Sequence, residues 1–136
     1  MDVTLSIPAD SHYSFAPRVV AAWLLSEIGA EIDLVEDARL AVDEVVGAFV
    51  SQGCGADVCF RALGDWVEVD VISTDDIDEI ELTPVAEQIL SVVAGGLRPI
   101  PGTRPGWHLR LRTPGADLPD TPDAWKAPAV ETEQTR

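Results

Sequence analysis

The apolar residues between positions 36 and 50 repeat at helical spacing and constrain the fold more than any other stretch of the chain. Four of them, spaced by four, three and four residues, fall on one helix face: Ala38, Val42, Val45 and Phe49. A second row, Leu40, Glu44 and Ala48, lies beside that face. The pattern predicts a helix that organises the core and carries one carboxylate at its edge. Glu44 is either the solvated edge of this helix or a catalytic group, and the general exposure of charged residues favours the first interpretation.

The other patterns predict strands and two further helices. Strict alternation predicts four strands, at residues 2–7, 56–62, 66–73 and 107–112. A helix over residues 12–28 is expected to bury Phe15, Val19 and Ala22, followed by Leu25 or Ile28. Asp33 and Glu36 are expected to form a capping pair for the core helix. Thr83 and Pro84 begin a third helix, whose expected buried residues are Val85, Ile89 and Val92 or Val93. Residues 97–106 are expected to form an irregular connection.

The order strand, helix, helix, strand, strand, helix, strand predicts an α+β fold with one sheet covered on one face by helices. Residues 1–113 are expected to form this single domain. Residues 114–136 are rich in Pro, Asp, Thr and Glu, which predicts a disordered acidic tail.

Charge and hydropathy exclude several classes of function. The net charge of −15, from 24 acids and 9 bases, argues against direct binding to nucleic acid. It also disfavours a polyphosphate ligand and favours a basic protein partner. No apolar run approaches the roughly 18 residues of a membrane helix, and the start of the chain does not resemble a signal peptide. We therefore expect a cytoplasmic protein that does not enter the membrane.

The remaining cysteine, acidic and histidine residues are interpreted as structural. Cys54 and Cys59 are expected to be ordinary thiols, because their spacing does not suit zinc. Residues 75–81 contain five acids in seven, apart from Ile77 and Ile80, and predict an exposed loop; a calcium site is the alternative. His108 is expected on the solvent side of the last strand.

Glu68 and Asp70 are expected to point outward from their strand. Arg39 and Asp43 are expected to pair on the exposed face of the core helix. Arg18, the only base in the first 38 residues, is expected to pair with an acid at the surface.

Three pieces of the chain together resemble a known family. They are Leu5-Ser6-Ile7-Pro8-Ala9 followed by Tyr13 and Arg18, the helical stretch 32–49, and the hairpin around Val67-Glu68-Val69. Over residues 2–112 they resemble the anti-sigma-factor serine kinases of the GHKL, or histidine-kinase-like, ATPase superfamily. The resemblance implies a two-layer α/β sandwich with a mixed, mostly antiparallel sheet.

The resemblance also implies that the nucleotide site has degenerated. The family's N-box glutamate, assigned as the general base, matches Glu44, but the magnesium-binding asparagine matches Ala48. The Asp-x-Gly motif that reads adenine falls on Ser73 and Asp75, and a shift of two residues loses its glycine. The glycine-rich phosphate box falls on residues 81–85, which contain no glycine. We therefore expect no cofactor, with ATP and Mg²⁺ as the alternative if Glu44 still serves a kinase.

With the nucleotide site expected to be lost, the remaining activity that the resemblance implies is partner binding. It implies a surface on the first helix, where Arg18 matches an arginine that the family uses for both of its partners. We expect Tyr13, Phe15 and Ala22 to belong to the same surface. The leading hypothesis is an anti-sigma factor or partner-switch regulator that sequesters an alternative sigma factor and is itself met by an antagonist. A homodimer formed through the sheet is a further expectation, and a serine kinase or a non-sigma adaptor are the alternative functions.

Overall fold

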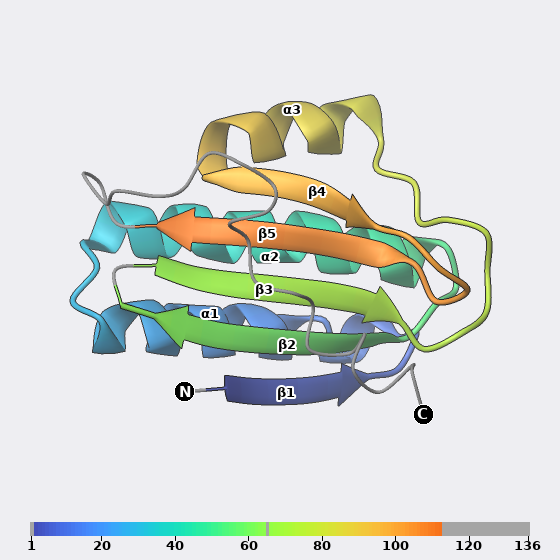
Figure 1. Cartoon of the computed structure of the whole chain (residues 1–136), viewed down its shortest axis with the longest axis horizontal. Coiled ribbons are helices and arrows are strands. Elements are labelled where there is room, and N and C mark those ends of the chain that lie inside the picture. The colour runs from blue at the N-terminus through green and yellow to red at the C-terminus, as the bar shows by residue number, and fades with distance from the viewer. Residues whose placement is uncertain (1, 65, 113–136) are drawn as a thin grey trace.

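A single antiparallel sheet runs through the molecule in the strand order β1-β2-β3-β5-β4 (Figure 1). The computed structural model describes residues 2–64 and 66–112, so the predicted tail at 114–136 lies outside the described residues. The strands are β1 (Asp2–Ile7), β2 (Ala56–Leu63), β3 (Trp66–Ser73), β4 (Gly96–Ile100) and β5 (Gly106–Arg112). All four neighbouring pairs are antiparallel, so the expected mixed sheet is wrong in this respect. The short connections from β2 to β3 and from β4 to β5 require antiparallel pairing of these strands, because parallel neighbours need a long crossover.

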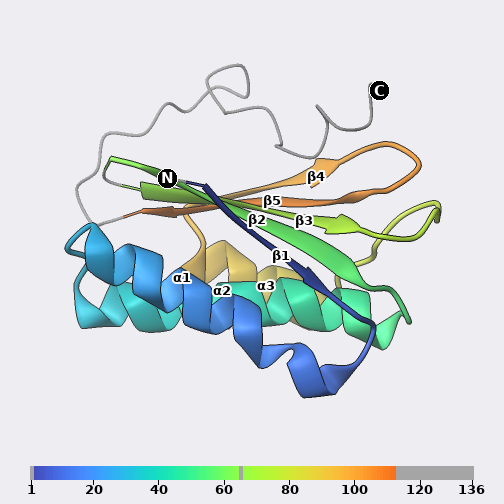
Figure 2. The same ribbon diagram turned by 90° about the horizontal axis from the view of Figure 1, so that it is seen from below.

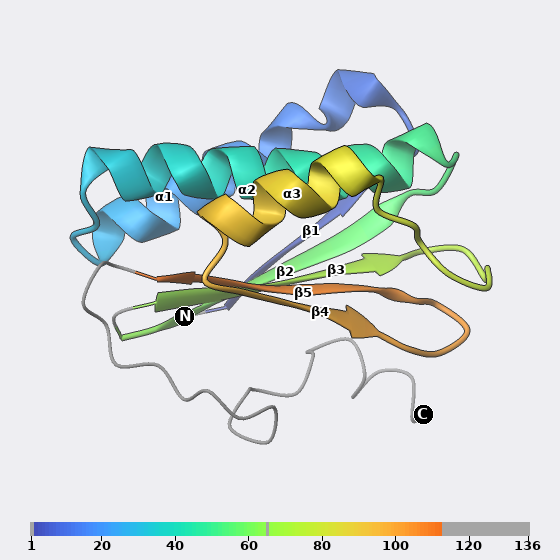
Figure 3. The ribbon, with the colours of Figure 1, turned by 90° about the horizontal axis from the view of Figure 1, so that it is seen from above.

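The helices of the described residues cover one face of this sheet (Figure 2 and Figure 3). They are α1 (Phe15–Glu27), α2 (Ile32–Ser51) and α3 (Pro84–Val93), and a 3-10 turn, η1 (Ser11–Tyr13), precedes α1. The predicted α+β architecture, with one sheet and its helices on one face, is confirmed. None of these helices combines the length and the apolar character that a membrane-crossing segment requires.

The core lies between α2 and the sheet. The four residues of the predicted α2 face are fully buried: Ala38, Val42, Val45 and Phe49. Alternate residues of the central strands meet them: Val58, Phe60, Val67, Val69, Val71, Leu109 and Leu111. This period of two sends the intervening side chains to the opposite sheet face.

The buried faces of α1 and α3 differ from the predicted ones. In α1 the residues that pack inward are Ala21, Leu24 and Leu25, whereas Phe15 and Val19 are exposed. Because α1 is apolar around most of its circumference, spacing alone does not select the face that packs. In α3 the buried residues are Ala86 and Leu90, whereas Val85 and Val92 are exposed.

Two further local predictions are corrected and one is confirmed. Residues 97–100, part of the segment 97–106 that was expected to be irregular, belong to the edge strand β4, where the missing donor of Pro99 is tolerated. The proposed cap at Asp33 is wrong, because α2 begins at Ile32 after Glu31, which makes no side-chain cap bond. Thr83 does cap α3, since its Oγ1 accepts from the Ala86 N–H at 3.1 Å.

Gly106 is required by the pairing of β3 with β5. A Cβ atom at this position would lie 1.9 Å from the carbonyl oxygen of Val71, much closer than any real contact. The absence of a side chain therefore lets β5 approach β3 at the point where the strand begins.

Candidate functional site

An apolar stripe runs along the outside of η1 and α1. Its members are exposed by about half: Tyr13 by 50%, Phe15 by 50%, Val19 by 54% and Trp23 by 46%. Phe15, Val19 and Trp23 recur every fourth residue and so lie above one another on the helix. We call Tyr13, Phe15, Val19 and Trp23 the α1 stripe. Large side chains that gather at the surface in this way mark an interaction site more often than scattered ones do.

Arg18 lies beside the α1 stripe and is held there by α2. Its Nη1 donates to Asp43 Oδ2 at 2.9 Å, and the two side chains are 40% and 35% exposed. Asp43 therefore pairs with Arg18 and not with Arg39 as predicted; Arg39 meets Glu36 at 3.3 Å instead. Partial exposure keeps the Arg18 guanidinium within reach of a docking protein.

The residues expected at a partner surface thus fall into two groups. Tyr13, Phe15 and Arg18 are accessible, each with 40% or more of its surface exposed. Ala22 is half-buried and packs against the core, so it contributes to the base of this surface. Val19 and Trp23 belong to the same surface, and sequence analysis missed them by assigning Val19 to the core. The helical spacing of Phe15, Val19 and Trp23 was the available signal.

Glu44 lies at a separate site, a hollow between α2 and the segment that enters α3. This hollow has a volume of about 520 Å³ and is lined by Glu44, Ala48, Glu81 and Pro84, among others. The volume falls within the usual range for small-molecule sites. The resemblance predicted a site for a nucleotide between these same segments.

The chemistry of the hollow does not fit magnesium-bound ATP. Of the described residues that line it, none is Lys or Arg, while Asp43, Glu44 and Glu81 supply carboxylates. The position expected to bind Mg²⁺ is the methyl group of Ala48, which provides no ligand. Pro84 removes a backbone donor from the start of α3, where a phosphate would need free N–H groups.

The segment bordering the hollow is also tied to the rest of the fold. The Gln52 side chain donates to the Glu81 carbonyl at 2.9 Å and accepts from the Glu81 N–H at 3.2 Å. Trp107 Nε1 donates to the Ile80 carbonyl at 2.9 Å. These bonds hold residues 80 and 81 against α2 and β5, at the place where the family's glycine-rich box was expected.

The position expected to read adenine also lacks a suitable group. Ser73 is buried, and its Oγ donates to the Asp75 carbonyl at 2.8 Å and accepts from the Asp75 N–H at 3.0 Å. Its hydroxyl is therefore used in a local turn, and Asp75 itself is exposed. The positions that the resemblance assigned to adenine and phosphate are thus engaged in local hydrogen bonds.

The acidic residues at 75–81 form an exposed loop, as predicted. Within residues 2–64 and 66–112, no group of three His, Cys, Asp or Glu side chains could hold a metal ion. The calcium alternative therefore gains no support from the described part of the chain.

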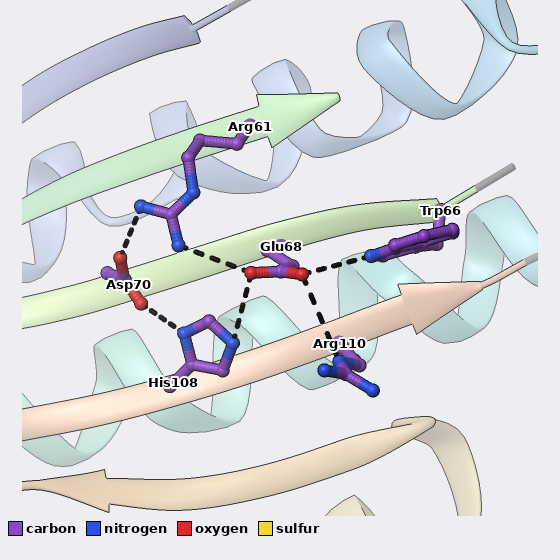
Figure 4. Close-up of polar contacts among 6 residues, drawn as sticks. All are labelled: Arg61, Trp66, Glu68, Asp70, His108 and Arg110. Carbon is purple, nitrogen blue, oxygen red and sulfur yellow. Dashed lines mark hydrogen bonds and ion pairs between the residues drawn. The ribbon is translucent and has the colours of Figure 1, made fainter. Parts of the chain in front are cut away.

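A cluster of charged side chains lies on the sheet face opposite the helices (Figure 4). The register aligns Arg61 with Glu68 and Arg110, and Asp70 with His108, across β2, β3 and β5. All five side chains are buried. Glu68, Asp70 and His108 do point away from the helices, but the prediction that they lie at the solvent is wrong. We call Arg61, Glu68, Asp70, His108 and Arg110 the sheet-face cluster.

Asp70 and Glu68 are the acceptors of this cluster. Arg61 Nη1 donates to Asp70 Oδ2 at 2.8 Å, and the Asp70 Oδ1 atom meets His108 Nδ1. Arg61 Nη2 donates to Glu68 Oε1 at 3.4 Å, and Trp66 Nε1 donates to Glu68 Oε2 at 3.0 Å. Burial disfavours the charged guanidinium, but Asp70 and Glu68 outweigh it and raise the pKa of Arg61 above its ordinary value. Opposite charges in neighbouring strands thus compensate one another, which buried charges require.

The two cysteines have structural roles. Both are free and buried, as expected of ordinary thiols. Burial raises the pKa of the Cys59 thiol, which keeps it protonated and unreactive.

Comparison with models of known protein families gives no match, and comparison with curated proteins gives none either.

Proposed function

We propose that this protein is an anti-sigma factor or a related partner-switch regulator with a histidine-kinase-like ATPase fold. It sequesters an alternative sigma factor by protein–protein binding and does so without binding ATP. The observation that carries the proposal is the α1 stripe with Arg18 beside it. Of the residues expected at a partner surface, Phe15 and Arg18 are accessible on α1, and Tyr13 is accessible on the preceding turn η1.

The α1 stripe has the composition of a binding hot spot. Aromatic residues and arginine dominate the energetics of protein interfaces, where they are enclosed by less important contacts. Arg18 uses one of its guanidinium nitrogens for Asp43, which leaves other N–H groups for a partner's carboxylate. Asp43 also restricts the Arg18 side chain before the partner arrives, which reduces the entropy cost of docking.

Charge supports the same assignment. With a net charge of −15, the chain attracts a protein that carries basic DNA-binding regions, as a sigma factor does. This attraction speeds encounter, while the α1 stripe provides the contacts that persist afterwards. Sequestration would then be stoichiometric, since no catalytic step is needed to keep the sigma factor from its other partners.

The test is a calorimetric titration of the purified chain against each alternative sigma factor of its source organism. Arg18→Glu is expected to weaken binding by about thirtyfold or more, as the loss of a hot-spot arginine does. Val19→Asp should weaken it similarly. Val92→Asp, which introduces the same charge at an exposed valine of α3, is the matched control and should bind normally. Equal affinities for the wild type and both α1 variants would refute the proposal.

A serine-protein kinase is the second candidate, favoured by one observation. The 520 Å³ hollow persists and has Glu44 in its lining, where a general base is expected. A kinase would show a rise in melting temperature with Mg-ATP and would transfer phosphate to an antagonist protein, with the transfer lost in Glu44→Ala. Sequestration without ATP predicts that neither effect is seen.

An adaptor that binds a different regulator would use the same surface. Copurification of the wild-type chain from its source organism, beside Arg18→Glu, distinguishes these cases. A sigma factor retained by the wild type and lost by the variant supports the proposal. Another protein that behaves in this way supports the adaptor.

A further inference from the structure

The sheet face opposite the helices, here called the outer face, is buried although no helix of the described residues lies over it (Figure 2 and Figure 3). Four charged side chains at its centre are at most 2% exposed: Glu68, Asp70, His108 and Arg110. An antiparallel sheet face without a covering layer is normally solvated. The burial of these side chains therefore indicates that a further segment lies over the outer face.

One end of the outer face is apolar. Ile72 in β3 and Ile100 in β4 share a register position, on either side of Gly106 in β5. Both isoleucines are buried and form a small cluster apart from the main core. Because burial of apolar surface stabilises such contacts, the covering segment is expected to include an apolar side chain.

The outer face also carries surplus positive charge, in a chain whose net charge is −15. Arg98 in β4 is aligned with His108, so its side chain shares the face of the sheet-face cluster. Arg61, Arg98 and Arg110 bring three guanidinium groups to this face, whereas the sheet-face cluster contains two carboxylates. The ion pair from Arg110 Nε to Glu68 Oε2 is long, at 4.0 Å. Buried charge requires compensation, so the covering segment is expected to be acidic.

We propose that the C-terminal segment, residues 113–136, folds back over the outer face of the sheet and covers it. β5 ends at Arg112, and Pro114-Gly115 follows almost at once, a dipeptide that favours reversal of the chain direction. Extended at about 3 Å per residue, the segment reaches about 70 Å, several times the roughly 20 Å width of a five-stranded sheet. Its length and starting point therefore allow it to cross the whole outer face.

The segment offers acids at a spacing that suits the bases of the outer face. Asp117, Asp120 and Asp123 recur every third residue, and a proline precedes the second and the third. Proline-rich chains favour the polyproline II helix, whose three residues per turn place such acids along one edge, about 9 Å apart. Arg98 and Arg110 are diagonal neighbours on β4 and β5, about 7–8 Å apart. Two successive aspartates can therefore meet these two arginines.

The segment also supplies the apolar contact. Leu118 and Trp125 lie next to the aspartates in the sequence and can cover Ile72 and Ile100. Composition alone predicts a disordered tail, but docking provides the partners that the isolated segment lacks. Because the two parts belong to one chain, a high effective concentration favours their contact. The inference is independent of the proposed function, since α1 lies in the other layer (Figure 2).

Paramagnetic relaxation in NMR spectra of the full chain locates the segment. A nitroxide attached to Ala124→Cys is expected to broaden the backbone amide signals of β4 and β5 most strongly. The signals of α1 and α2 should be less affected, because these helices lie behind the sheet. The native Cys54 and Cys59 are buried, so the label should react at position 124 alone.

A charge-matched pair of variants tests the role of the aspartates. Replacing Asp117, Asp120 and Asp123 together by asparagine should abolish the selective broadening of β4 and β5. We call this the triple variant. The control removes the same charge from the exposed acidic loop and should keep the broadening: Asp76→Asn, Asp78→Asn and Glu79→Gln together. Circular dichroism checks that both remain folded.

Trypsin gives a second readout, because Lys126 is the only lysine of the chain and lies within the segment. When opening is fast relative to cleavage, the rate after Lys126 follows the population of the undocked segment. We expect cleavage at least about tenfold faster in the triple variant than in the wild type or the loop control. High salt should raise the wild-type rate toward that of the triple variant, since it screens the ion pairs.

Each outcome decides the inference. Broadening of β4 and β5 that the triple variant loses supports it. Equal broadening of both layers overturns it, and so does broadening centred on the helices or an unchanged rate of cleavage after Lys126 in the triple variant. Mixing isotope-labelled chain without nitroxide and unlabelled chain with it identifies a second copy as the occupant. Broadening of β4 and β5 in that mixture would overturn docking within one chain.

Discussion

Replacing Asp70 with alanine is expected to cost a large share of the stability of the fold. Asp70 is fully buried, accepts from Arg61 at 2.8 Å and meets His108. Its removal leaves the buried Arg61 guanidinium with only the longer 3.4 Å contact to Glu68. Removing one partner of a buried ion pair costs about 3–5 kcal/mol. Total stabilities of domains are about 5–15 kcal/mol, so the loss is a third or more for much of that range.

Asp43 provides a matched control within the same chain. Its ion pair with Arg18 has nearly the same length, 2.9 Å, but both side chains are more than a third exposed. Water compensates such groups when the pair is broken, so Asp43→Ala is expected to cost at most about 1 kcal/mol. The two variants therefore compare the loss of a buried Arg–Asp contact with the loss of a partly exposed one.

Urea denaturation followed by circular dichroism measures both effects as changes in the free energy of unfolding. Asp70→Asn adds a third point, because it keeps the shape of the side chain and removes its charge. We expect the loss in the free energy of unfolding to be largest for Asp70→Ala, smaller for Asp70→Asn and smallest for Asp43→Ala. The reasoning fails if Asp70→Ala costs no more than Asp43→Ala, since the sheet-face cluster would then not depend on the compensation of buried charge.

The remaining predictions concern single positions. Gly106→Ala should destabilise the fold by about 3 kcal/mol, because its Cβ meets the backbone of β3, whereas Gly47→Ala on α2, with no atom within 4 Å, should stabilise it by about 0.5–1 kcal/mol; thermal melts separate the two. Thr83→Ala should cost about 1 kcal/mol through loss of the α3 cap, measured in the same way. Burial raises the pKa of Cys59, so the unfolded thiol ionises first: stability should be constant below the unfolded pKa of about 8.5 and fall as pH rises toward the folded value. In Cys59→Ala this alkaline loss should be smaller, and an unchanged pH profile would contradict the assignment.

Local sequence patterns predicted the secondary structure well where the apolar residues of an element fall on a single face. The α2 face of Ala38, Val42, Val45 and Phe49 is buried as the spacing indicated, and the cap at Thr83 forms as predicted. In α1 and α3 apolar residues lie on more than one face: Leu25 is buried as predicted, but tertiary packing buries Leu24 and Leu90 in place of Val19 and Val85. The edge strand β4 was missed because its Gly and Pro residues suggest an irregular segment, while its pairing with β5 is a long-range property.

The difference between local patterns and long-range contacts also applies to the candidate sites. The sequence drew attention to Arg18 and predicted that the nucleotide elements are missing, because both predictions depend on residue identity at single positions. It could not indicate that Asp43 would pair with Arg18, since that contact joins two helices. The sheet-face cluster required the strand register. Bases in β2 and β5 flank acids in β3, and only the observed alignment brings Arg61, Asp70 and His108 together.

The most direct test of the central claim is the dependence of sigma-factor binding on nucleotide. The wild-type chain is titrated against its sigma factor by calorimetry, first without nucleotide and then with saturating Mg-ATP. Sequestration through α1 by a chain that does not bind ATP predicts the same affinity in both titrations. Binding that appears or strengthens only with Mg-ATP would contradict it, and would show that the hollow beside Glu44 still holds a nucleotide.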